Sequence, residues 1–327
     1  MNATDAIAPT KARRTPFSLI QSQEATLAVF LVLILAFLAI ATPTFMDAQN
    51  IRDVLVNASF PAIAAIGMTL VIISAEIDIS IGSILAVVAV LTGNLALTGM
   101  PIPLVFLIGL IAGTLLGALN GALVAYAGIP SIIVTLGALS FWRGLVIYIT
   151  QGAWIYNMPE EFHFAQRSWF DMPIPVWMMA ILILLAGLYM RFSPLGRQFY
   201  AVGGNRQAAM LAGIPIKRRL LLVLTLNGTF AAIAAMIYAS RFSVVQSNAG
   251  LGFEFQVITA VVIGGTSIMG GTGSIWGSFL GALLMAVIGT GMTFLKLSPY
   301  WLQTVQGSLI LLAVVSDMVR RRRMLNR

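Results

Sequence analysis

About ten apolar segments follow one another along this chain, each close to the length of a helix that crosses a membrane. They lie at about residues 26–41, 55–75, 81–99, 102–127, 130–150, 174–192, 219–240, 254–270, 275–295 and 300–318. A membrane-crossing helix needs about 20 apolar residues. Charged residues make up 9% of the chain and the mean hydropathy is +0.95, which is far too apolar for a water-soluble domain. The sequence therefore predicts an all-α integral membrane protein with about ten transmembrane helices.

The charged residues divide the chain into three parts and orient it. A polar leader, 1–24, precedes the membrane domain at 25–318, and a basic tail, 319–327, follows it. Lys and Arg gather in the leader, in the tail and in the loop at 193–218, whereas the loop at 154–171 is mainly acidic. Cytoplasmic flanks of membrane proteins are rich in Lys and Arg. We therefore expect a multi-pass membrane protein with both termini in the cytoplasm. The net charge of +8 comes from these flanks, so nucleic-acid binding is not expected.

Two glycine-rich segments resemble each other and suggest an internal repeat. "GTLLGALNGAL" at 113–123 aligns with "GSFLGALLMAV" at 277–287. In the expected topology the two segments run in opposite directions, which is typical of transporters built from two inverted halves of five helices. The alternative is that small residues at this spacing only mark close helix packing.

The residues needed for catalysis or nucleotide binding are missing from the sequence. Cys is absent, His163 is the single histidine, and no phosphate-binding G-x-x-x-x-G-K-[ST] motif occurs. We therefore expect no enzyme, no ATPase site, no metal site and no cofactor bound by this chain.

The segment "ISAEIDISIGS" at 73–83 carries two carboxylates, Glu76 and Asp78, between apolar segments. Charge inside a span is costly, so a carboxylate there is a functional-site hypothesis by default. The polar residues and the glycine around them are typical of a helix break that lines a solute path. The alternative is a short cytoplasmic turn with both carboxylates in water, which the expected segment boundaries slightly favour.

A further glycine-rich segment, "TAVVIGGTSIMGGTGSIWGS" at 259–278, permits either a discontinuous helix or plain tight packing. Other polar residues inside the spans, Gln303 and Gln306 among them, are suited to a path for a hydroxyl-rich solute or to hydrogen bonds between helices. The candidate path residues are Glu76, Asp78, Asn120, Thr135, Asn227, Thr259, Thr266 and Ser267.

The loop at 193–218 is polar and basic in an otherwise apolar chain. Pro194 and Gly196 are expected to end the preceding helix, and Asn205 is suited to cap a short helix that ends at Gly213 and Pro215. The helix has a small apolar face formed by Ala208, Ala209, Leu211 and Ala212. We expect it to dock into a groove of another protein; the alternative is an amphipathic connector that lies on lipid headgroups.

Three motifs together resemble the signatures of the permease subunits of bacterial ABC importers for monosaccharides, the ribose, xylose, rhamnose and autoinducer-2 group. They are "AEIDISIGS", "GGNRQAAMLAGI" and "ITAVVIGGTSIMGGTGSIWGS", in this order, and the similarity extends over about residues 27–318. Members typically have two glycines where this chain has Ala75 and Glu76. That departure resembles the rhamnose-like branch, so rhamnose is weakly favoured as the substrate.

The resemblance implies a type II ABC importer permease of the bacterial inner membrane that pairs with a second permease chain, identical or paralogous. It also implies a cytoplasmic ATPase subunit, which binds ATP and Mg, and a periplasmic sugar-binding protein. The loop between the sixth and seventh spans would be the coupling helix. Glu160, Glu161 and Arg241, in the outer loops, would be candidates for docking the binding protein. The residues that would meet the ATPase are Gly203, Gly204, Asn205, Ala208, Ala209, Gly213 and Ile214.

Two alternatives stay open at this point. The first is an importer permease of the branched-chain amino-acid type, although few fixed charges are available to meet a charged substrate. The second is a stand-alone secondary carrier or channel, which would move solute without an ATPase and would leave the basic loop unexplained.

Overall fold

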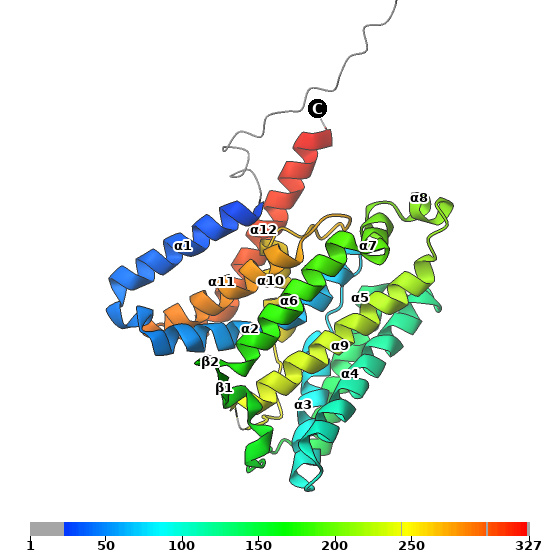
Figure 1. Ribbon diagram of the computed structural model, residues 1–327. Helices are drawn as coiled ribbons and strands as arrows, with labels where there is room; N and C mark the ends of the chain where they lie inside the picture. The colour runs from blue at the N-terminus through cyan, green and yellow to red at the C-terminus, as the bar shows by residue number, and fades with distance from the viewer. Residues whose placement is uncertain (1–22, 243, 299, 326–327) are drawn as a thin grey trace, which may run out of the picture.

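The apolar segments form helices that pack side by side in one bundle, seen in the computed structural model (Figure 1). The structure describes residues 23–242, 244–298 and 300–325. The α-helices are α1 (Gln23–Ala41), α2 (Ala48–Ile73), α3 (Ile81–Leu97), α4 (Ile102–Ala125), α5 (Ser131–Thr150), α6 (Ile174–Phe192), α7 (Pro194–Gly204), α8 (Arg206–Leu211), α9 (Ile216–Phe242), α10 (Phe253–Ile263), α11 (Ile275–Phe294) and α12 (Trp301–Leu325). Short 3-10 helices lie at η2 (Pro43–Met46), η3 (Glu160–Phe162) and η4 (Phe164–Gln166), and strands β1 (Ser168–Trp169) and β2 (Met172–Pro173) form a small antiparallel hairpin.

Within the described residues, seven helices are long and apolar enough to cross a membrane: α1, α2, α4, α5, α6, α9 and α11. Three further helices, α3, α10 and α12, are apolar over 10–17 residues. The expectation of an all-α membrane protein is thus confirmed, whereas the count of ten spans is not established. The expected span at 254–270 is wrong in its extent, because α10 ends at Ile263.

The long helices α2 and α9 form the centre of the bundle, and α3, α4, α10 and α11 pack around them. Close approach between helices depends on small residues. A side-chain carbon at Gly113 would lie 2.6 Å from the Cβ atom of Ala232 and 2.8 Å from the carbonyl oxygen of Gly228, on α9. Gly277 and Gly281 of α11 meet the backbone of α10 in the same way. Both glycine-rich segments are therefore used for close helix packing, and the inverted repeat stays a prediction.

The loop that follows α6 contains two helices rather than one. The expected short helix is present as α8, and the Asn205 side chain caps it by accepting a hydrogen bond from the backbone N–H of Ala208 at 2.9 Å. The preceding segment was expected to be irregular but forms α7, whose first turn is capped by Ser193. Proline favours the first turn of a helix, so Pro194 begins α7 instead of preventing it.

The first described residues of α1, the end of α12 and the α7–α8 segment lie toward the same end of the bundle, opposite the β-hairpin (Figure 1). Residues 319–325 of the expected tail prolong α12, and the leader at 1–22 and residues 326–327 lie outside the described residues.

Candidate functional site

A break between α2 and α3 holds the first candidate motif. Helix α2 ends at Ile73, α3 begins at Ile81, and Ala75 has a left-handed backbone with φ +60°. The backbone N–H of Ile77 donates to the hydroxyl of Ser131 on α5, over 3.2 Å. Such a break frees backbone groups inside an apolar protein, and each of them needs a partner. Side chains from other helices, such as Ser131, therefore stabilise the break by bonding its free backbone groups.

Asp78 is fully buried at the centre of this break. One carboxylate oxygen accepts hydrogen bonds from the backbone N–H and the hydroxyl of Ser80, at 2.8 and 2.6 Å. The other accepts from the side-chain amide of Asn227 on α9, at 2.9 Å. Asn120 on α4 donates to the Ser80 hydroxyl at 2.8 Å. The expectation of a turn with both carboxylates in water is therefore wrong for Asp78, because buried donors of Ser80, in the break itself, and of Asn227, on α9, replace the water.

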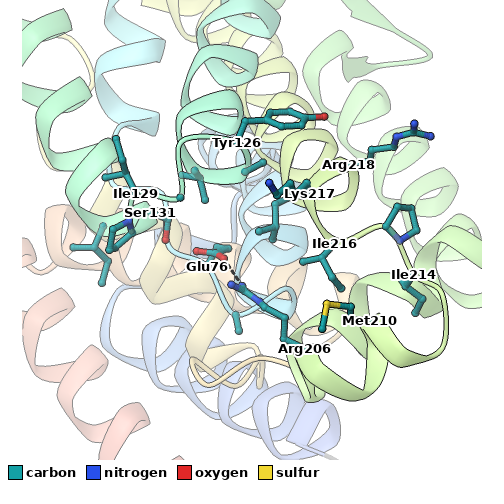
Figure 2. Close-up of a pocket in the computed structure, with 18 residues that line it drawn as sticks. Glu76, Tyr126, Ile129, Ser131, Arg206, Met210, Ile214, Ile216, Lys217 and Arg218 are labelled. Carbon is teal, nitrogen blue, oxygen red and sulfur yellow. Dashed lines mark hydrogen bonds and ion pairs between the residues drawn. The ribbon is translucent and has the colours of Figure 1, made fainter.

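Glu76, two residues away, has a different environment. Its carboxylate forms an ion pair with Arg206 of α8, with 2.5 Å between the nitrogen and the oxygen, and its residue is 8% exposed. The pair lies on the wall of a cavity of about 1010 Å³ between the break, the α4–α5 connection and the start of α9 (Figure 2). Lys217 and Arg218 also line this cavity, so its described walls carry more positive than negative charge.

The third motif forms a second break, between α10 and α11. Gly265, Gly270, Gly271 and Gly273 all have positive φ values, which glycine adopts without steric cost. The two breaks touch, because the backbone N–H of Gly271 donates to the carbonyl oxygen of Ile73 at 2.8 Å. The sequence leaves a discontinuous helix and plain tight packing open for this segment. In the structure α10 and α11 are separate helices joined by this connection, and they pack side by side through Gly281 against Ala260 and Gly277 against Gly264, as the packing interpretation expects.

The α7–α8 segment contacts both breaks. The Tyr200 hydroxyl donates to the carbonyl oxygen of Gly273 at 2.9 Å, and Gly203 packs against Ile73 and Gly271 so closely that a side-chain carbon there would overlap their backbone. Burial raises the pKa of Tyr200, and the nearby Glu24 raises it further. The phenol therefore stays protonated and remains a hydrogen-bond donor at neutral pH.

The candidate coupling residues divide into exposed and covered positions. Gly204, Asn205, Ala208 and Gly213 are exposed, and Gly203 and Ile214 are half-buried. Ala209 is 4% exposed and packs into the protein, so the side chain expected to meet a partner is covered in this conformation. Met210 and Leu211 are 62% and 87% exposed. The sequence places Leu211 on the small apolar face of this helix, but it did not identify Met210 as a further exposed apolar residue.

The candidate path residues do not form one lining. Asp78, Asn120 and Asn227 are joined in the buried cluster at the first break, and the Thr135 hydroxyl lies 3.4 Å from the carbonyl oxygen of Ile77. The other four residues lie elsewhere. Glu76 faces the cavity, Thr259 bonds within α10, and Thr266 and Ser267 belong to the second break. A path role for these residues stays a prediction.

Ser80 belongs to the polar residues that the sequence associates with a break, but its bonds to Asp78 and Asn120 were not predicted. Two further partners, Ser131 and Arg206, were missed. Nothing in the sequence pairs Arg206 with Glu76 at a separation of 130 residues.

Long apolar helices whose polar connections are buried in the bundle and tied to a surface segment are typical of polytopic membrane transport proteins. The chain belongs to the family described as "Branched-chain amino acid transport system / permease component", whose model matches residues 50–314.

Several characterised members of transport systems are similar to this chain. It is 34% identical to a ribose import permease protein of Haemophilus influenzae, over 88% of this chain and 91% of the relative. It is 33% identical to an autoinducer 2 import system permease protein of Photorhabdus luminescens, over 90% of each chain. It is 32% identical to a D-allose transport system permease protein of Escherichia coli, over 92% of this chain and 93% of the relative. No solved structure matches the chain.

Proposed function

We propose that this chain is the membrane-spanning permease subunit of an ATP-driven, binding-protein-dependent importer for a monosaccharide or a similar hydroxylated solute. Relatives named for ribose import, autoinducer 2 import and D-allose transport support this class of substrate. The weaker preference for rhamnose is a prediction that these relatives do not test. The family description mentions branched-chain amino acids, but these relatives favour the sugar.

One observation carries the proposal: the surface helices α7 and α8 are joined to both helix breaks. Arg206 reaches the first break through Glu76, and Tyr200 reaches the second through Gly273. A partner that displaces α8 would therefore move the connection between α2 and α3 and the connection between α10 and α11. Coupling of this kind requires contacts that differ between two conformations, and these contacts are suited to that role.

The two ends of the bundle would bind different protein partners. The cytoplasmic ATPase, with its ATP and Mg, would bind the exposed α8 surface formed by Asn205, Ala208, Met210 and Leu211. A periplasmic binding protein would dock at the opposite end, where Glu160 and Glu161 are exposed. Arg241 is a weaker candidate for that docking, because it forms an ion pair with Asp53 at 3.2 Å. A second permease chain would complete the path, and both termini would lie in the cytoplasm of an inner-membrane protein.

The test is to purify the tagged chain gently from its native membranes and to measure both the proteins that accompany it and ATP hydrolysis. We expect a stoichiometric ATPase subunit that is lost from Leu211→Asp and retained by Met46→Asp. Met46 is a matched control, since it is a half-exposed apolar residue at the opposite end of the bundle. A chain that purifies alone and moves solute in vesicles without ATP would be a secondary carrier instead.

A further inference from the structure

A second hollow lies at the end of the bundle opposite α8, between the α9–α10 connection and the start of α12. Its volume is about 420 Å³, within the range of about 300–1,000 Å³ that is common for small-molecule sites. Five side-chain amides line it, and four of them are Gln246, Gln256, Gln303 and Gln306. We call this cavity the amide hollow.

The amides of this hollow are free to bind a ligand. Gln306 is only 7% exposed, Gln246 and Gln256 are half-buried, and Gln303 is exposed. In the described part of the chain, no side-chain hydrogen bond engages Gln246, Gln256, Gln303 or Gln306. Each amide offers one acceptor and two donors, so several unused groups of both kinds surround one small volume. Amides in an apolar bundle that lack protein partners are costly unless water or a ligand satisfies them.

One wall of the amide hollow is aromatic. The ring of Phe60 stacks on Phe253, with centroids 5.9 Å apart and planes 23° apart, and Tyr238 meets Phe60 edge to face at 5.8 Å. The electron-rich face of an aromatic ring attracts the C–H groups on the apolar face of a sugar ring. An aromatic wall beside several amides thus matches a ligand that has hydroxyl groups at its edge and C–H groups on its face.

The uncharged lining of the amide hollow restricts the chemical class of its ligand. None of its described lining residues is Asp, Glu, Lys or Arg. An amino acid carries two full charges, and burying them against neutral amides alone leaves both without a counter-charge. A neutral polyhydroxylated solute needs only the hydrogen bonds that the amides supply.

We propose that the amide hollow is a binding site for a neutral monosaccharide at the outer end of the permease, through which the solute passes on its way to the helix breaks. This inference rests on the proposed import function for the direction of movement, but not for the chemistry of the site. Gln303 and Gln306 would donate and accept hydrogen bonds with the sugar hydroxyls, and Phe60 and Tyr238 would contact its ring.

The chain contains no cysteine, so single cysteines can report on this hollow without further changes. Gln303→Cys and Gln306→Cys place a thiol in it, whereas Thr304→Cys places one on the same helix outside its lining. Ala153→Cys, in an exposed loop at the same end, reports any general effect of solutes on the reagent. The measurement is the rate at which a small water-soluble thiol reagent modifies each full-length variant in membrane vesicles, with and without D-ribose, D-allose or L-leucine.

We expect the reagent to modify Gln303→Cys and Gln306→Cys and a sugar to slow both reactions. The slowing would be about threefold at twice the dissociation constant of the sugar, when two thirds of the sites are occupied. Thr304→Cys and Ala153→Cys would react at the same rate with and without sugar. Equal rates with all solutes at all four positions, or Gln306→Cys that no reagent reaches, would overturn the proposal. Protection by L-leucine but not by sugars would overturn the assigned ligand class.

The ATP requirement of uptake distinguishes a failure of the proposed import function from a failure of the proposed binding site. If sugars protect Gln306→Cys while wild-type vesicles take up the same sugar without ATP, the hollow binds sugar in a secondary carrier. If uptake requires ATP while no solute protects the hollow, the import function stands and the sugar binds elsewhere.

Discussion

Arg206 of α8 and Glu76 of the first helix break form an ion pair across 130 residues of sequence, with 2.5 Å between the nitrogen and the oxygen. The Glu76 side chain is 9% exposed and that of Arg206 is 50% exposed, so the two partners are unequally desolvated. The pair is the charged contact through which a movement of α8 reaches the break.

We expect Glu76→Gln and Arg206→Gln each to reduce sugar uptake more than they reduce stability. The pair is partly solvated, so its loss should change the free energy of unfolding by about 1 kcal/mol. Transport should fall further because α8 is no longer held to the break. The exchange Glu76→Arg with Arg206→Glu should recover part of the uptake lost in Glu76→Arg alone. A double variant that transports no better than either reversed single variant would show that the pair has no role in coupling.

Asp78 should be needed for stability, since its carboxylate accepts bonds from Ser80 and Asn227 in a fully buried position. We expect Asp78→Ala to cost about 1–3 kcal/mol for each buried donor left without an acceptor. The measurement is the unfolding transition of the purified chain in detergent. Asp171→Ala is the control, because Asp171 is an exposed carboxylate paired with Arg52 and should cost about 1 kcal/mol or less. Equal effects of the two substitutions would contradict the buried cluster.

Gly203 and Gly204 are adjacent but should respond differently to the same substitution. A side-chain carbon at Gly203 would overlap the carbonyl group of Ile73, whereas at Gly204 it would meet the Cα atom of Gly271 at an ordinary 3.9 Å. We expect Gly203→Ala to cost about 1–3 kcal/mol by overpacking and to impair uptake, with Gly204→Ala close to wild type. The two variants are matched, so uptake and thermal unfolding can be compared directly. If Gly203→Ala changes neither uptake nor thermal unfolding, α7 does not pack on the break.

Tyr200 should contribute stability that disappears at high pH. Its hydroxyl bond to Gly273 should be worth about 0.5–1.5 kcal/mol, so Tyr200→Phe should lower the free energy of unfolding by that amount at neutral pH. The pKa of Tyr200 is raised above its ordinary value of 10.0 by burial and by Glu24. The contribution is therefore full below about pH 10 and falls as the pH rises through the raised pKa. Unfolding measured for both proteins across this range should show the difference shrinking; a constant difference would exclude the titration.

Some local features could be predicted because they depend on neighbouring residues alone. The cap on α8 is an example, since Asn205 bonds a backbone N–H three residues away. Helix α7 was missed because Pro194, Gly196 and two further glycines are typical of a loop. Gly203 is required by its close contacts with Ile73 and Gly271, which are distant in the sequence and so could not be predicted from neighbouring residues.

The environment of the two carboxylates could not be predicted for the same reason. Glu76 and Asp78 are two residues apart, yet one faces a cavity and an arginine while the other is enclosed by Ser80 and Asn227. Whether a carboxylate meets water or protein depends on distant helices.

The sequence by itself determined the class of this protein, because apolar length and the placement of charge act locally and leave few folds that can satisfy the backbone in a membrane. It also indicated the three motifs and the capped helix between the sixth and seventh apolar segments. Only the tertiary structure decided that these motifs meet, through the contacts of Ile73 with Gly271 and of Glu76 with Arg206. Such contacts join residues far apart in the chain, and they form only when packing of the whole bundle brings their partners within hydrogen-bond distance.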